Sequence, residues 1–158
     1  MIDQHVKMAE LLPIMLEGLA YGKEVKLSPM GISMLPMLRQ GRDTVILSPV
    51  PERLKKYDLP LYQRDDGKYV LHRIVRAGER YSCVGDNQFA IEHNLRHDQM
   101  IALVTAFCRD GKEISVNSRS YRLYCRFWHG SRPIRRIWRG CIHRLGRLLK
   151  AVKNKTTV

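Results

Sequence analysis

Residues 69–75 have the sequence Tyr-Val-Leu-His-Arg-Ile-Val, a run of β-forming residues with a histidine at its centre. Side chains alternate between the two faces of a strand, so His72 shares a face with Val70 and Ile74. Arg73 takes the opposite face. The alternation therefore predicts that His72 points toward the core side of a sheet and that Arg73 points away from it.

Short runs of the same type lie on both sides of this one, with turn residues between them. Two of the connections, Asp65-Asp66-Gly67 and Asp110-Gly111, have the composition of hairpin turns. Short strands at this spacing predict a mainly β domain, built as a coiled antiparallel sheet or partly closed barrel. The predicted strands cover residues 25–27, 44–47, 60–63, 69–75, 81–84, 101–109 and 113–116.

An amphipathic helix is predicted at residues 3–21, because apolar side chains recur there at helical spacing. Gly22 fits a stop just beyond its end. Pro13 lies inside the segment and should kink or split the helix. We accordingly divide this part of the chain into an N-terminal helix at 1–24 and a β domain at 25–117.

The net charge of +13 comes from the C-terminal part of the sequence. Residues 117–158 hold 12 of the 28 Lys and Arg and neither Asp nor Glu, whereas the preceding residues hold 16 basic and 15 acidic side chains. Apolar side chains recur here at three- and four-residue steps, which predicts a basic amphipathic helical tail at 118–158. Ser131 before Pro133 fits a helix start. The apolar stripe consists of Ile134, Ile137, Trp138, Cys141, Ile142, Leu145, Leu148, Leu149 and Val152.

Three interpretations of this tail stay open. It can pack on its own domain with a solvated basic face, it can bind nucleic acid, or it can lie on an anionic membrane surface. Large apolar side chains such as Trp138 and Leu145 suit a membrane interface and would contribute little to phosphate contacts. We therefore expect residues 118–153 to meet an anionic membrane surface, and nucleic acid is the less favoured partner.

The remaining composition bears on the compartment and on metals. The four cysteines form no CxxC pair and indicate free thiols in a reducing compartment. Asp3, Lys7 and Glu10 interrupt the apolar core that a secretory signal needs, and no stretch is long and apolar enough to span a bilayer. His93 and His97 lack the spacing of a known metal motif, so we expect neither metal nor cofactor. These features predict a cytoplasmic protein, held peripherally on the cytoplasmic face of the membrane.

Residues 31–36, Gly-Ile-Ser-Met-Leu-Pro, place a small residue two positions before Ser33, which lets backbone amides approach a substrate carbonyl. A serine beside Gly and Pro is usually only a turn residue. This segment, however, is similar to the nucleophile box of type I signal peptidases and LexA-like self-cleaving repressors. Residues 41–45, 71–75 and 85–88 resemble, in the same order, the strand after that box, the strand carrying the base and the Gly-Asp-Asn box of these proteins.

The resemblance implies a serine peptidase with Ser33 as nucleophile and His72 as general base. Many of these enzymes have Lys where this chain has His72, but the endoplasmic-reticulum type and its bacterial and archaeal relatives have His, so the chain resembles the His type. A neutral imidazole can accept a serine proton directly near neutral pH. Asp86 and Glu92 both stay open as the acid that orients His72.

The resemblance also implies an oxyanion site at the backbone amide of Ser33, with help from Gly31. Signal peptidases often have a Ser hydroxyl at that earlier position. Ile32 and Met34, which flank the nucleophile, are expected to contribute to binding of the oxyanion or the substrate. The substrate would be a peptide or leader sequence bound as an extended strand beside the sheet.

Two other functions compete with a serine endopeptidase. A LexA-like self-cleaving regulator would carry a DNA-binding domain, for which residues 1–24 are too short. It would also carry an Ala-Gly or Cys-Gly cleavage dipeptide, which is absent before Ser33. A catalytically inactive binding module, acting through its basic tail, is the third hypothesis.

Overall fold

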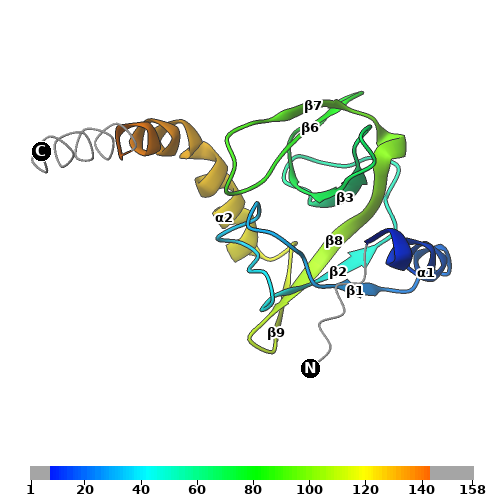
Figure 1. Ribbon diagram of the computed structural model, residues 1–158. Helices are drawn as coiled ribbons and strands as arrows, with labels where there is room; N and C mark the ends of the chain where they lie inside the picture. Colours follow the sequence, from blue (N-terminus) through cyan, green and yellow to red (C-terminus); the bar gives the residue numbers. More distant parts are fainter. Residues whose placement is uncertain (1–7, 143–158) are drawn as a thin grey trace, which may run out of the picture.

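Two antiparallel sheets make up most of the computed structural model, which describes residues 8–142 (Figure 1). The six-stranded sheet contains β1 (Val25–Leu27), β2 (Thr44–Ser48), β3 (Pro60–Gln63), β4 (Tyr69–Leu71), β8 (Met100–Arg109) and β9 (Lys112–Ser115). The three-stranded sheet contains β5 (Arg73–Arg76), β6 (Tyr81–Val84) and β7 (Glu92–Leu95). The helices are α1 (Met8–Ala20), α2 (Arg119–Gly130) and the short 3-10 helix η1 (His97–Gln99).

The prediction of a mainly β, antiparallel fold is confirmed, whereas no closed barrel forms within residues 8–142. The larger sheet has the order β1-β2-β8-β3-β4, and β9 pairs with β8. β8 organises this sheet because its first residues pair with β3, its middle with β2 and its end with β9. Bulges interrupt its pairing with both β2 and β3, and such bulges increase the local twist of a sheet.

The predicted strand at 69–75 divides at His72. β4 ends at Leu71 in the larger sheet and β5 begins at Arg73 in the smaller one, so the chain passes between sheets at the histidine. The prediction that Arg73 points away from the core is wrong, because both His72 and Arg73 are buried. Simple alternation fails where the protein covers both sides of the chain, with Tyr62 next to His72 and α2 residues against Arg73.

Strand β7 was not predicted from the sequence. Its residues Glu-His-Asn-Leu have no apolar alternation, and only Leu95 is buried. Asn94 adopts a left-handed backbone conformation with φ of 62°, and the pairing with β6 is irregular. The strand exists because β6 offers it a partner, which is a long-range effect that local sequence does not carry.

Helix α1 runs without interruption through Pro13, so the predicted splitting did not occur. Pro13 is exposed, and water can serve the carbonyl group that its missing N–H leaves free. Met15 and Leu19, on the opposite face of α1, are buried in the main hydrophobic cluster. Residues 3–7 of the predicted helix lie outside the described residues.

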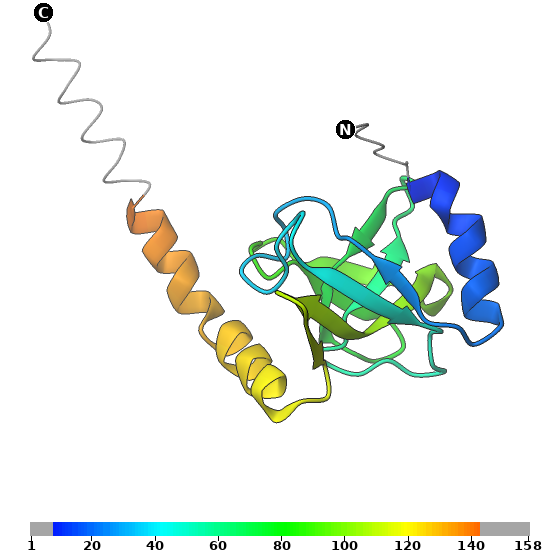
Figure 2. The same cartoon turned by 90° about the horizontal axis from the view of Figure 1, so that it is seen from below.

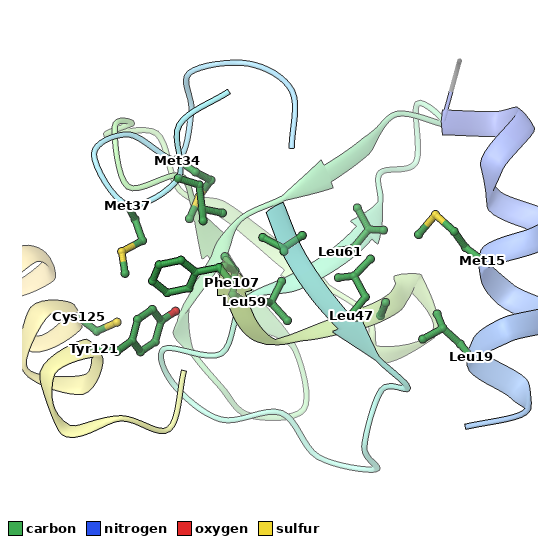
Figure 3. Packing of buried hydrophobic residues seen from close by; sticks show 14 residues of the cluster. Met15, Leu19, Met34, Met37, Leu47, Leu59, Leu61, Phe107, Tyr121 and Cys125 are labelled. Carbon is green, nitrogen blue, oxygen red and sulfur yellow. The ribbon is translucent and has the colours of Figure 1, made fainter. Parts of the chain in front are cut away.

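The first part of the predicted tail belongs to the domain core. Ser118 caps α2 by accepting a hydrogen bond from the amide of Tyr121, and both Tyr121 and Cys125 are buried in the main cluster. Figure 3 shows these two side chains beside Phe107, whose ring centroid lies 6.0 Å from that of Tyr121. Helix α2 therefore packs on the sheets as an integral element.

The chain turns at Ser131 and is helical again from residue 132 to 142, in agreement with the predicted start near Pro133. This second segment extends away from the β domain (Figure 2). The rest of the predicted apolar stripe, from Leu145 onward, lies outside the described residues. Among residues 8–142, no helix has both the length and the apolar character needed to traverse a bilayer.

Replacing Tyr121 by Ala should lower the free energy of unfolding by about 3–5 kcal/mol, because it removes a buried aromatic ring from the main cluster. Denaturant unfolding followed by circular dichroism measures the change. Tyr21→Ala serves as the control, since Tyr21 is 75% exposed and its loss should change stability by no more than about 0.5 kcal/mol. Equal stability of the two variants would contradict the packing of α2 on the sheets.

Candidate active site

Ser33 lies in the loop between β1 and β2, and the 85–88 segment holds this loop from the other side. The amide of Asn87 donates a 2.8 Å hydrogen bond to the carbonyl oxygen of Ser33. The side-chain amide of Asn87 donates a 3.2 Å bond to the carbonyl oxygen of Ile32. The Gly-Asp-Asn segment thus fixes the backbone on both sides of the Ile32–Ser33 peptide bond.

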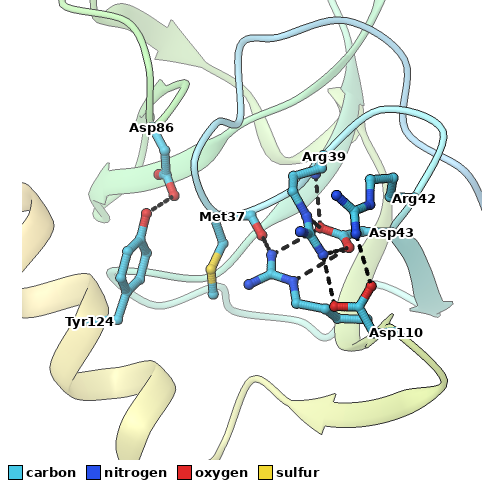
Figure 4. A network of polar contacts seen from close by, with 8 residues as sticks. Met37, Arg39, Arg42, Asp43, Asp86, Asp110 and Tyr124 are labelled. Atoms are coloured by element: carbon cyan, nitrogen blue, oxygen red, sulfur yellow. Dashed lines mark hydrogen bonds and ion pairs between the residues drawn. The ribbon is translucent and has the colours of Figure 1, made fainter.

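A buried ionic cluster anchors the far end of the same loop (Figure 4). Asp43 is 1% exposed and accepts hydrogen bonds from the guanidinium groups of Arg39 and Arg109. Arg109 also donates to the carbonyl oxygen of Met37, inside the loop. Burial would raise the pKa of Asp43, but the hydrogen bonds from Arg109 and Arg39 outweigh it and lower the pKa to about 2. Asp43 therefore stays ionised and ties the loop to β8.

His72 is buried and has a carboxylate at one ring nitrogen. Its Nδ1 lies 3.1 Å from Oε1 of Glu92 and 3.3 Å from the hydroxyl oxygen of Tyr62. A carboxylate at Nδ1 favours the tautomer with the proton on that nitrogen, which leaves the lone pair on Nε2. Burial lowers the pKa of His72, although the charge of Glu92 partly opposes the shift. The imidazole is therefore neutral near neutral pH, as a general base must be.

Arg64 holds the carboxylate of Glu92, including Oε1, the oxygen that His72 approaches. Its Nε donates a 2.7 Å hydrogen bond to Oε2 of Glu92, and its terminal nitrogen bonds the other carboxylate oxygen. Burial would raise the pKa of Glu92, but the hydrogen bonds from Arg64 and Tyr62 outweigh it and lower the pKa. A two-point contact of this kind fixes the plane of the carboxylate as well as its charge.

Gly85 lies close to both the Ser33 loop and His72. A Cβ atom at this position would stand 2.6 Å from the carbonyl oxygen of Ser33 and 3.1 Å from Nε2 of His72. Any larger residue would push these two groups apart. The close approach explains why the segment needs glycine here, and it shows that Nε2 of His72 and the carbonyl oxygen of Ser33 border the same small space.

Asp86 does not contact His72, which answers the question that the sequence left open. Its carboxylate pairs with Arg73 through two bonds of 2.9 Å and also accepts from Tyr124 and His129 of α2. Burial would raise the pKa of Asp86, but the charge of Arg73 and the hydrogen bonds from His129 and Arg73 lower it to about 2. Of the two candidate acids, Glu92 contacts His72 and Asp86 joins α2 to the sheets.

A groove of about 630 Å³ runs past Ser33 and His72. On one side it is lined by residues of β1 and the segment after it, including Lys26 and Leu27, and on the other by β4. Within the described residues β1 pairs only with β2, and β4 only with β3, so each keeps one backbone edge unpaired. Leu11 of α1 and Arg64 complete the lining at the sides. The site thus opens between the two edge strands of one sheet.

The predicted oxyanion residues occupy different positions. Gly31, with φ of 83°, donates its amide to Oε1 of Gln40 at 2.8 Å, so this donor is already engaged. The amide of Ser33 makes no hydrogen bond within residues 8–142 and is available to a substrate oxygen. The side chain of Ile32 is exposed, whereas Met34 is buried and lines the groove.

The histidines near Glu92 have separate protein partners. His93 lies 3.1 Å from the hydroxyl of Ser82, and His97 lies 3.2 Å from the hydroxyl of Tyr81. In the part of the chain that the structure describes, no three His, Cys, Asp or Glu side chains gather in an arrangement suited to a metal ion.

Several contributors to the site carry no local sequence signal. Tyr62 and Arg64 come from β3 and the turn after it, and they meet Glu92 only because the two sheets lie against each other. Tyr124 and His129 reach Asp86 from a helix that sequence analysis assigned to a separate tail. No hydrogen bond joins the Ser33 hydroxyl to His72 among the described residues, so proton transfer between them belongs to the proposal below.

Comparison with known proteins gave no match to a family model, to a curated protein or to a solved structure. The geometry of the site and the resemblance of the four sequence segments are therefore the grounds for a function.

Replacing Gly85 by Ala should lower reactivity toward an activity-based serine probe by roughly 100-fold, since the added methyl group displaces the Ser33 loop from His72. Gly78→Ala is the matched control, because a Cβ there meets no atom closer than 3.8 Å. Circular dichroism establishes that both variants are folded. Unchanged labelling of a folded Gly85→Ala protein would contradict the proposed closeness of the two groups.

Replacing Glu92 by Gln should slow probe labelling by about 10²–10⁴-fold, because the amide no longer enforces the Nδ1–H tautomer of His72. Glu92 raises the pKa of His72, so its loss lowers that pKa and moves the acid limb of the pH profile to lower pH. Labelling rates measured across pH report both effects.

The matched control for this measurement is Asp86→Asn. It leaves the buried Arg73 without its carboxylate partner and should destabilise the fold by about 3–5 kcal/mol. Any folded fraction should shift the pH profile less than Glu92→Gln does, because the charge of Asp86 raises the pKa of His72 less than that of Glu92. If Asp86→Asn shifted the pH profile and Glu92→Gln did not, the assignment of the two acids would be reversed.

Proposed function

We propose that this protein is a serine endopeptidase of the signal-peptidase-like group that cleaves a peptide or leader sequence with a Ser33–His72–Glu92 site. The observation that carries the proposal is the contact of Glu92 with Nδ1 of His72, while Nε2 lies beside Gly85 together with the carbonyl oxygen of Ser33. The order of the four sequence segments supports the same assignment.

In the proposed reaction, His72 accepts the proton of the Ser33 hydroxyl as its oxygen attacks a peptide carbonyl. The amide of Ser33 donates to the oxyanion, and Glu92 stabilises the imidazolium that forms. His72 then protonates the leaving amine, and a water molecule hydrolyses the acyl-enzyme through the same steps. Arg64 acts through Glu92 as a positioning residue.

An extended peptide suits the groove. A strand lying between β1 and β4 would find unpaired backbone donors and acceptors on both sides, and its side chains would alternate into the groove. The lining is mostly apolar, with Lys26 and Arg64 as the basic residues. These features favour an unfolded segment over a folded protein surface as the substrate.

We place the activity in the cytoplasm, on the inner face of the membrane, as part of the same proposal. The cysteines are free, which suits a reducing compartment, and basic segments favour the anionic cytoplasmic leaflet. Cell fractionation with a tagged full-length chain tests this placement. Recovery of the protein outside the cell would contradict it.

The Ser33→Ala variant should label at least about 10³-fold more slowly with a fluorophosphonate-type serine probe, because the nucleophile is lost. Ser28→Ala is the control. Ser28 also lines the groove, and the protein that lacks its hydroxyl should label at the rate of the wild type. Equal reactivity of wild type and Ser33→Ala, in labelling and in cleavage of candidate leaders, would leave the non-catalytic binding module as the better hypothesis.

A further inference from the structure

The segment from α2 to residue 142 has one face that is occupied by the protein and one that is not. On the occupied face, Tyr121 and Cys125 are buried, and the indole of Trp128 donates a 2.8 Å hydrogen bond to the carbonyl oxygen of Asp86. After the turn, Arg132 donates to the carbonyl oxygen of Phe89 at 2.7 Å, and Arg139 to that of Asn87 at 3.4 Å. These contacts fix which face of the segment points outward.

The outward face is apolar to an extent that is unusual for an exposed helix. Its large side chains are between 54% and 72% exposed, and they recur at three- and four-residue steps. Because the inner positions are already filled, packing on the chain's own domain does not account for them. These residues, called here the apolar face, are Leu123, Phe127, Ile134, Ile137, Trp138 and Ile142.

The positive charge around the apolar face indicates what kind of partner it binds. Residues 117–142 contain seven arginines and no aspartate or glutamate. A second copy of this chain would bring the same positive charge to the contact, which disfavours self-association. Nucleic acid would satisfy the arginines but leave Trp138 and the neighbouring isoleucines exposed to water.

We infer that residues 119–142 dock on an anionic lipid bilayer, with the apolar face inserted at the level of the headgroups and arginines such as Arg126 and Arg136 at the lipid phosphates. Arginine suits this role because its guanidinium group binds phosphate oxygens at two points. An amphipathic helix with a tryptophan on its apolar side and a basic polar side has the composition of an interfacial helix. The docking depends on neither the catalytic residues nor the proposed reaction.

The test measures sedimentation of the full-length Ser33→Ala protein with vesicles, so that its outcome is independent of peptidase activity. Vesicles of phosphatidylcholine with equimolar phosphatidylglycerol should bind the protein, and vesicles of phosphatidylcholine alone should bind it far less. Trp138→Ser should reduce the bound fraction by about tenfold in partition coefficient, because it removes a side chain that inserts. Ile14→Ser is the control, since Ile14 is 70% exposed, close to the 69% of Trp138, and lies on α1.

A second measurement tests the charge. It compares the double variant Arg126→Glu/Arg136→Glu with the double variant Arg53→Glu/Lys55→Glu on the β domain. The first pair should weaken binding to anionic vesicles by more than about tenfold, an effect that shrinks as salt is raised. The second pair should change binding much less.

Three outcomes would overturn the inference. One is unchanged binding of the Trp138→Ser variant to anionic vesicles, which would mean that other residues bind the lipid. Another is a dimer that Ile137→Ser dissociates in the absence of vesicle binding, which would assign the apolar face to a second copy. The last is preference for duplex nucleic acid over anionic vesicles at equal salt.

Discussion

The buried ion pair between Arg73 and Asp86 joins three parts of the chain that are distant in sequence. Both side chains are fully buried, and removing two ions from water costs several kcal/mol for each. The surroundings offset this cost by filling the remaining hydrogen-bonding positions. Tyr124 and His129 donate to the carboxylate, while the hydroxyl of Tyr121 and the thiol of Cys125 lie against the guanidinium group. Every one of these partners comes from α2, so the helix and the ion pair require each other.

The ion pair also sets the distance between the two halves of the candidate site. Arg73 directly follows His72, and Asp86 lies between Gly85 and Asn87, which contact the Ser33 loop. Fixing the Arg73 and Asp86 side chains on the far side of the backbone therefore holds the histidine and the serine loop on the near side. His72 lines the groove, whereas Arg73, the next residue, contacts α2. Strand alternation makes that division possible, and the exchange of sheets at His72 allows both side chains to be buried.

Local pattern was sufficient where one element determines its own structure. The strands at 25–27, 60–63 and 81–84 were predicted with their observed bounds. Local pattern failed where pairing with another strand determines the structure. The 69–75 run divides between two sheets, and β7 forms by pairing with β6 despite its polar sequence. The same distinction holds for the site. Ser33 and His72 were predicted from the resemblance of ordered segments, and Glu92 was one of two candidate acids. Arg64 was not predicted, because nothing local relates β3 to residue 92.

The two carboxylates illustrate how environment separates roles that residue type leaves equivalent. Asp86 is sealed by α2 and paired with a buried arginine, so its charge serves the fold and has no access to the groove. Glu92 is 24% exposed on its side chain, contacts His72 and pairs with Arg64, which lines the groove, so its charge lies next to the site. Helix α2, which covers Asp86, lies on the opposite side of the sheets from α1, whose Leu11 lines the groove (Figure 3).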